Sequence, residues 1–109
     1  MIHSPNSQSG GARLLTELEE ALRAAELWSL TQPSAEALAS QQPFACDTLA
    51  LEQWLQFIFI PRLRAMLEAN AAVPPMQLLP MAEVTWQSLH QPVQRVLASF
   101  DRWSQSLHE

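Results

Sequence analysis

Glycine and lysine are the residues that this chain of 109 most clearly lacks. It contains two glycines, which are adjacent at Gly10 and Gly11, and it has no lysine and no tyrosine. Because the turns of a β-rich fold usually need glycine, the shortage of glycine favours helices. Two glycines near the N-terminus also cannot build a glycine-rich loop that binds phosphate.

Cysteine and histidine are nearly as scarce. Cys46 is the single cysteine, so no disulfide can form within the chain, which suits a reducing compartment. The three histidines, at positions 3, 90 and 108, show no metal-ligand spacing with Cys46. Cys46 is followed by Asp47, and a neighbouring carboxylate disfavours the thiolate that a nucleophile needs. We therefore expect no catalytic residue, metal or cofactor, and we interpret Cys46 as a small core residue.

Positive charge is also sparse. Six arginines stand against 11 acidic residues, for a net charge of −5. Nonspecific nucleic-acid binding needs several cations that face phosphates, so we expect no DNA binding and no direct RNA binding. The N-terminus lacks the apolar core of a signal peptide, and the apolar run FIFIP is too short to span a bilayer. These features predict a cytoplasmic protein that does not enter the membrane.

Helical periodicity describes most of the chain. Residues 1–11 are polar and predict a disordered tail, followed by a single domain at 12–109. Apolar stripes predict helices at about 12–30, 49–70, 81–90 and 92–107, with a short Ser34-capped turn and a proline-containing extended segment at 71–80 in between. Such helices can bury their stripes only against one another. The sequence predicts an all-α fold, a compact four-helix bundle, with a helical dimer that shares its core as the alternative.

Pro61 interrupts the second of these helices. At about 100° per residue, the apolar stripe changes phase near Pro61, so we predict a proline kink that lets the helix face two neighbours. Arg62 then falls on the apolar side, where a charge needs a carboxylate or several carbonyls. Asp47 and Asp101 are the candidate partners. In the alternative interpretation, the aliphatic part of the Arg62 side chain lies on the apolar surface and its guanidinium reaches solvent.

The residues before this helix and the aromatic residues supply further candidates. Asp47 or Thr48 offers an N-cap oxygen to the second helix, and Phe44 is predicted to insert into the core. The four tryptophans fall one per helix, which is typical of a shared aromatic core, although tryptophan is also common at interfaces. Core packing is the default interpretation of the apolar residues in the 71–80 segment and of two phenylalanines in the second helix. The alternative is a partner surface, formed first by the segment and then by the phenylalanines: Val73, Met76, Leu78, Leu79, Phe57 and Phe59.

The run SQQPFACDTLALEQWLQFIFIPRL, from Ser40 to Leu63, resembles the YqcC-like family of small bacterial proteins. The matching pieces are Pro43-Phe44, Asp47-Thr48, Trp54-Leu55-Gln56 and Pro61-Arg62, and Asp101 in the last helix is also similar. The resemblance implies an all-helical bundle without an established activity. Genes of this family often lie beside the gene for tRNA pseudouridine synthase C, which implies a link to tRNA modification.

Three functional hypotheses follow. The first is a non-enzymatic helical module that binds another protein or a second copy of itself. The second is a bundle that binds a small ligand or a structured RNA, with Arg62 as the anchor for an anion. The third is an enzyme that uses Asp47 and Arg62. The candidate structural or binding residues are Phe44, Asp47, Thr48, Trp54, Gln56, Pro61, Arg62 and Asp101.

Overall fold

The regular structure of residues 6–108, the part of the chain that the computed structural model describes, is entirely helical. The α-helices are α1 (Asn6–Ala24), α2 (Ala35–Leu38), α3 (Leu51–Trp54), α4 (Ile60–Glu68), α5 (Leu79–Trp86) and α6 (Gln91–Ser106). A 3₁₀ turn, η1 (Pro43–Ala45), precedes α3, and a π-helical turn, η2 (Leu55–Phe59), joins α3 to α4. The all-α fold predicted from the sequence is confirmed.

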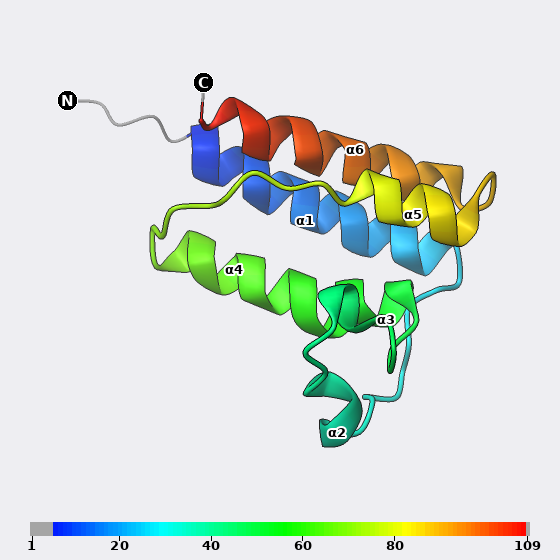
Figure 1. Ribbon diagram of the computed structural model, residues 1–109. Helices are drawn as coiled ribbons and strands as arrows, with labels where there is room; N and C mark the ends of the chain where they lie inside the picture. The colour runs from blue at the N-terminus through cyan, green and yellow to red at the C-terminus, as the bar shows by residue number, and fades with distance from the viewer. Residues whose placement is uncertain (1–5, 109) are drawn as a thin grey trace.

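The longest helices, α1 and α6, lie side by side and antiparallel (Figure 1). Helix α4 packs against α1, and α5 packs against α6. Residues 71–78 run without regular structure from the end of α4 to α5, across the face of the bundle (Figure 1). We call residues 71–78 the strap. No helix in residues 6–108 has the length and apolar character needed to cross a membrane.

Helix α1 begins earlier than the sequence predicts. Residues 6–11 are helical, so the prediction of a disordered tail is wrong for them, and residues 1–5 lie outside the described part.

The glycines lie where α1 approaches α6. A Cβ atom on Gly11 would come within 2.9 Å of the ring carbons of Trp103, and one on Gly10 within 3.0 Å of its Nε1. Glycine therefore permits close contact between helices here, instead of a turn.

Two helices end through left-handed residues that are not glycine. Glu26 has a φ of 61° just after α1, and the next amide, of Leu27, donates a hydrogen bond to the carbonyl of Leu22 at 2.8 Å. Asn70, with a φ of 54°, ends α4 in the same way. This Schellman geometry satisfies terminal carbonyls and ends α1 and α4 before the limits predicted at 30 and 70.

The interruption predicted at Pro61 is a π-helical turn that ends at Phe59, two positions before the proline. In a regular α-helix, Leu63 would point about 120° away from Leu51. A π turn adds one residue, which brings Leu63 back to the side of Leu51 and Leu55, and all three side chains are buried. The phase change in the sequence thus produces a π turn that keeps a single apolar face directed at the core.

One apolar cluster fills the space between the helices. Its most deeply buried members are Leu15, Leu18, Leu22, Leu55, Leu63, Val93, Leu97 and Phe100. Trp86 is buried, whereas Trp28, Trp54 and Trp103 are only partly buried. The tryptophans therefore lie around the edge of the core, and the interpretation as a shared aromatic core is correct only for Trp86.

Candidate functional site

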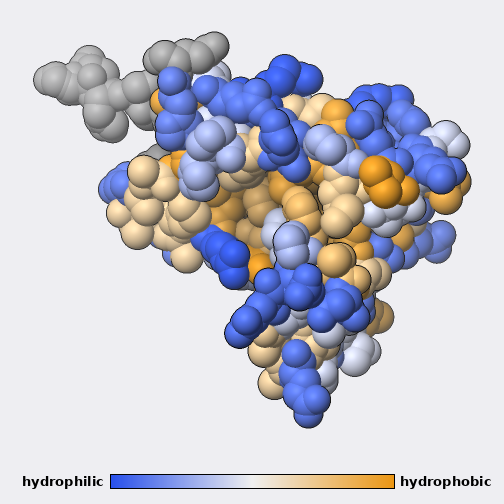
Figure 2. Space-filling model, in the orientation of Figure 1, coloured by the Kyte–Doolittle hydropathy of each residue, from blue (hydrophilic) through white to orange (hydrophobic). Residues whose placement is uncertain are grey.

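A groove opens between the strap and the helical segment that contains the π turn. Its volume is about 290 Å³, and Figure 2 shows hydrophobic residues gathered in a hollow on this face of the molecule. Helical residues form one wall, strap residues form the other, and η1 contributes one aromatic ring. The lining residues are Trp54, Phe59, Arg62, Leu63 and Met66 on the helix, Pro74, Met76, Gln77 and Leu78 on the strap, and Phe44.

A chain of aromatic rings connects the groove to the core. The Phe44 and Trp54 ring centroids are 4.8 Å apart in an edge-to-face arrangement, and Trp54 stacks on Phe59 at 5.6 Å. Phe59 in turn contacts Phe100 at 5.2 Å, again edge to face. Both geometries are favourable for aromatic pairs. Because Phe44 and Trp54 are only partly buried, part of their aromatic surface remains accessible to solvent.

The turn that presents Phe44 has a strained backbone. Phe44 has a φ of 57° and Ala45 a φ of 49°, which is the left-handed region that residues with a side chain rarely adopt. Each such residue costs about 1–3 kcal/mol and persists only where its surroundings hold it. The contact between Phe44 and Trp54 and the burial of Ala45 supply that hold. Strain of this kind concentrates at binding and catalytic sites.

Arg62 is the charged residue of the groove. It is exposed, and it makes no ion pair or hydrogen bond in the described part of the chain. The predicted ion pair with Asp47 or Asp101 is therefore wrong, and the alternative of a solvent-directed side chain is correct. The π turn explains this outcome, because it rotates Arg62 out of the apolar stripe. Arg64 differs, since it pairs with Glu19 of α1 at 2.8 Å.

Asp47 and Thr48 fix the segment before α3 instead of capping that helix. The Thr48 hydroxyl donates to the carbonyl of Ala37 at 2.7 Å, and Asp47 accepts a hydrogen bond from the Ser40 hydroxyl. The N-cap of α3 is Ala50, so the predicted capping role of Asp47 or Thr48 is wrong. The chain makes a further turn before α3 begins. Both side chains instead hold α2 next to η1 and thereby help to position the groove.

Gln56 fastens the π turn to the connection between α1 and α2. Its side-chain carbonyl accepts from the Ser29 N–H, and its amide donates to the Ser29 carbonyl, both at 2.8 Å. The Gln56 side chain is buried, so these bonds satisfy polar groups that water hardly reaches. The motif singled out Gln56, but its partner could not be predicted from a separation of 27 residues.

Asp101 of α6 fixes the junction between the strap and α5. Its two carboxylate oxygens accept hydrogen bonds from the N–H groups of Leu78, at 2.7 Å, and Leu79, at 3.0 Å. The first amides of a helix have no partner within the helix, so a carboxylate from another helix supplies one. Asp101 thus caps α5 across the bundle.

Two other side chains of α6, and His108 just after its end, continue this attachment along the strap. Ser104 accepts from the Met76 N–H at 2.8 Å, and Gln105 donates to the Met76 carbonyl at 3.1 Å. His108 lies 2.7 Å from the carbonyl of Val73 through Nε2. Positions 101, 104, 105 and 108 share one face of a helix. That spacing of polar residues was the sequence signal that could have identified Ser104, Gln105 and His108, which sequence reasoning missed.

Among the described residues, no His, Cys, Asp or Glu lines the groove. No cluster of three His, Cys, Asp or Glu residues that could hold a metal occurs among the residues described. Cys46 is exposed, so its interpretation as a core residue is wrong. It lines a smaller pocket of about 160 Å³ between η1 and α5.

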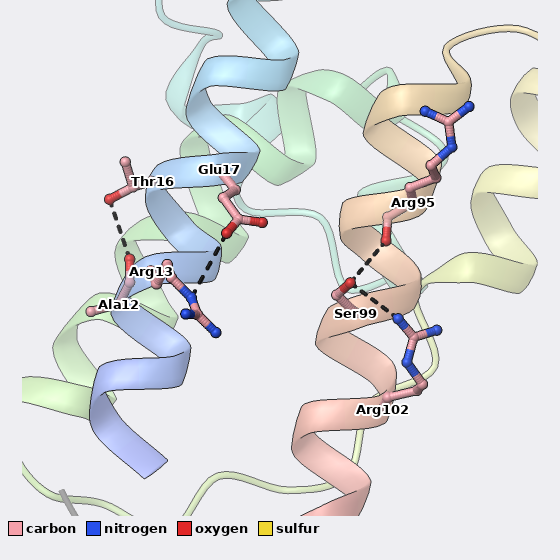
Figure 3. Close-up of polar contacts among 7 residues, drawn as sticks. All are labelled: Ala12, Arg13, Thr16, Glu17, Arg95, Ser99 and Arg102. Atoms are coloured by element: carbon pink, nitrogen blue, oxygen red, sulfur yellow. Dashed lines mark hydrogen bonds and ion pairs between the residues drawn. The ribbon is translucent and has the colours of Figure 1, made fainter. Parts of the chain in front are cut away.

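Arginines also lie on an exposed face of α1 and α6 (Figure 3). Arg13 lies 3.8 Å from the carboxylate of Glu17, and Arg102 donates to the hydroxyl of Ser99 at 3.3 Å. Arg95 lies one turn before Ser99 on α6, and the Ser99 hydroxyl donates a hydrogen bond to the backbone carbonyl of Arg95. None of these arginines lines the groove, so they provide charge-matched controls for Arg62.

The groove and its supports define a small helical protein with an open apolar groove, and comparison with known proteins gives its family. The family model DUF446, described as tRNA pseudouridine synthase C, matches residues 11–105. The chain belongs to the DUF446 family.

Three relatives each match 60 residues, or 55% of this chain. An uncharacterized protein of Haemophilus influenzae is 43% identical over 57% of its own length. Protein YqcC of Escherichia coli K12 is 35% identical over 55% of its length. The tRNA pseudouridine synthase C of Pectobacterium carotovorum subsp. carotovorum is 42% identical over 16% of its length. The match thus spans little more than half of two relatives and a small part of the third.

A solved structure shares the fold. The solution NMR structure of YqcC from E. coli superposes with a TM-score of 0.72 at 24% identity, covering 88% of this chain and 89% of that one. Together with the sequence match to YqcC, this confirms the resemblance to the YqcC-like family that the motif indicated.

Proposed function

We propose that this chain is a non-catalytic interaction module that binds a tRNA pseudouridine synthase of the C type. The observation that carries the proposal is the open apolar groove. Three of its lining residues, Phe44, Trp54 and Arg62, belong to the motif that carries the resemblance to the YqcC-like family. A concave apolar surface with a single charge is suited to recognising another protein.

The names of the relatives support the choice of partner. The family description and the Pectobacterium relative both name tRNA pseudouridine synthase C, and the similar segment is 16% of that relative. We assign the pseudouridine chemistry to the unmatched remainder of such a protein. A separate chain of the family then contributes a contact surface to the enzyme.

The chemistry of the groove supports binding over catalysis. Its lining holds one guanidinium and one amide among apolar side chains, with no carboxylate, thiol or imidazole. General acid–base or nucleophilic catalysis needs such groups in contact. The net charge of −5 argues against direct binding of tRNA, because the chain would repel its phosphates.

The test is a calorimetric titration of the purified chain with the tRNA pseudouridine synthase C of the same organism, with and without ribonuclease. We expect saturable binding that survives ribonuclease, and no pseudouridine formation by the chain alone. Loss of the complex on ribonuclease treatment would indicate a bridge through RNA, and absence of binding would contradict the proposal.

The unpaired state of Arg62 favours a second candidate function, which is binding of a small amphipathic anion. A volume of about 290 Å³ is at the lower end of the range of small-molecule sites. A structured RNA fits less well, because Arg62 is the one cation in the lining. Native mass spectrometry of the purified chain tests this candidate, since a retained ligand would appear as a fixed added mass that Arg62→Met abolishes.

A further inference from the structure

We infer that the groove receives one large apolar side chain of the synthase, and that an adjacent aspartate or glutamate of the synthase pairs with Arg62. This inference rests on the proposed function, and it names the surface and the chemistry of the contact.

The size and lining of the groove set the apolar part of the occupant. A volume of about 290 Å³ accommodates one large side chain. Trp54 and Phe59 supply flat aromatic surface on the helical wall. Met66 and Met76 lie on opposite walls, and the unbranched methionine side chain adapts to the shape of what it contacts.

Charge sets the polar part of the occupant. The Arg62 guanidinium has no carboxylate partner among the described residues, and no carboxylate lines the groove. A guanidinium matches a carboxylate with two parallel hydrogen bonds. The rest of the chain is acidic, with a net charge of −5. Within the lining of the groove, an acidic segment is attracted to Arg62, which is the one charged residue there.

Both walls are held in place before a partner arrives. The helical wall is fixed by the two hydrogen bonds between Gln56 and Ser29. The strap wall is fixed by α6, for example through Asp101 and Ser104. A preformed groove loses little conformational entropy on binding, so a contact of modest area can still be specific.

The experiment measures the Kd of the synthase for the wild-type chain and for single variants. Arg62 is exposed, and Arg62→Glu reverses the charge that is proposed to pair with a carboxylate of the synthase. Arg95→Glu makes the same change at an exposed position of α6. We expect Arg62→Glu to raise the Kd about tenfold or more, and Arg95→Glu to leave it within about twofold. Met66→Gln preserves size and helix propensity but makes the wall polar, and should raise the Kd about fivefold or more.

The outcomes separate this inference from the proposed function. If the wild-type chain does not bind the synthase, the proposed function is wrong. If it binds and neither Arg62→Glu nor Met66→Gln weakens the complex, the function stands and the groove is not the site. Equal weakening by Arg62→Glu and Arg95→Glu also overturns the inference, because it indicates general electrostatic attraction. Restoration of Arg62→Glu binding by one Asp→Lys or Glu→Lys change in the synthase identifies the carboxylate.

Discussion

The side chain of Gln56 and the backbone of Ser29 form two hydrogen bonds with each other, one in each direction, both at 2.8 Å. The pair joins the π turn to the chain that leaves α1. Because the π turn sets the direction of Arg62 relative to Trp54, a contact outside the groove helps to determine its shape.

Replacement of Gln56 by leucine should lower the free energy of unfolding by about 2 kcal/mol. The volume is preserved, but the N–H and carbonyl of Ser29 lose their partners in a partly buried position. Urea unfolding followed by circular dichroism measures the change. Gln32→Leu is the control, since Gln32 is exposed and its replacement should change stability by less than about 0.5 kcal/mol. A similarly small effect for Gln56→Leu would contradict the structural role.

Asp101→Ala should release the junction between the strap and α5. It leaves the amides of Leu78 and Leu79 without their acceptor, at a cost of about 2 kcal/mol. Hydrogen exchange at these two amides should become faster, whereas exchange in the middle of α1 should change only by the loss of global stability. Asp101→Asn retains one acceptor oxygen and should be intermediate. Unchanged exchange at Leu78 and Leu79 would show that Asp101 does not hold this junction.

The sequence was most informative where structure depends on local pattern. The apolar stripes predicted the four main helical segments, and Ser34 caps the short α2 by accepting from the Ala37 N–H, as predicted. It was least informative where residues far apart in sequence meet. Asp101 lies 23 positions from Leu78, so the sequence does not reveal that its carboxylate caps α5. For that reason Asp101 was predicted as a partner of Arg62.

The direction of Arg62 could not be predicted because it depends on a change of helix type. A constant 100° per residue places Arg62 inward and Leu63 toward the polar side. The π turn reverses both, leaving Leu63 buried and Arg62 exposed. The phase change itself was visible in the sequence. Its structural form depends on which arrangement packs best against α1, and that is a property of the whole fold.

Gly11→Leu should destabilise the chain by about 1–3 kcal/mol, because even a Cβ there would lie 2.9 Å from Trp103 and 3.1 Å from Leu67. The Trp103 ring must move, so the tryptophan emission spectrum should also change. Ala12→Leu, at the next and exposed position of α1, is the control and should have little effect. Equal stability of the two variants would mean that α1 does not approach Trp103 so closely.

Two substitutions to glycine, one within α1 and one just after it, should change the free energy of unfolding in opposite directions. Glu26 has a φ of 61°, which glycine adopts without steric cost, so Glu26→Gly should raise the free energy of unfolding by about 0.5–1 kcal/mol. Glu20 is exposed within α1, where Glu20→Gly should lower it by about 1 kcal/mol. Thermal unfolding of both variants measures the difference. Destabilisation by Glu26→Gly would contradict the left-handed end of α1.

The tryptophan indole N–H signals give the most direct test of the groove as the binding surface. In a ¹H–¹⁵N spectrum of the labelled chain titrated with the synthase, we predict that the Trp54 signal shifts or broadens first. Trp28 and Trp86, which do not line the groove, should change least. A titration in which Trp28 or Trp86 responds while Trp54 keeps its position would contradict the account.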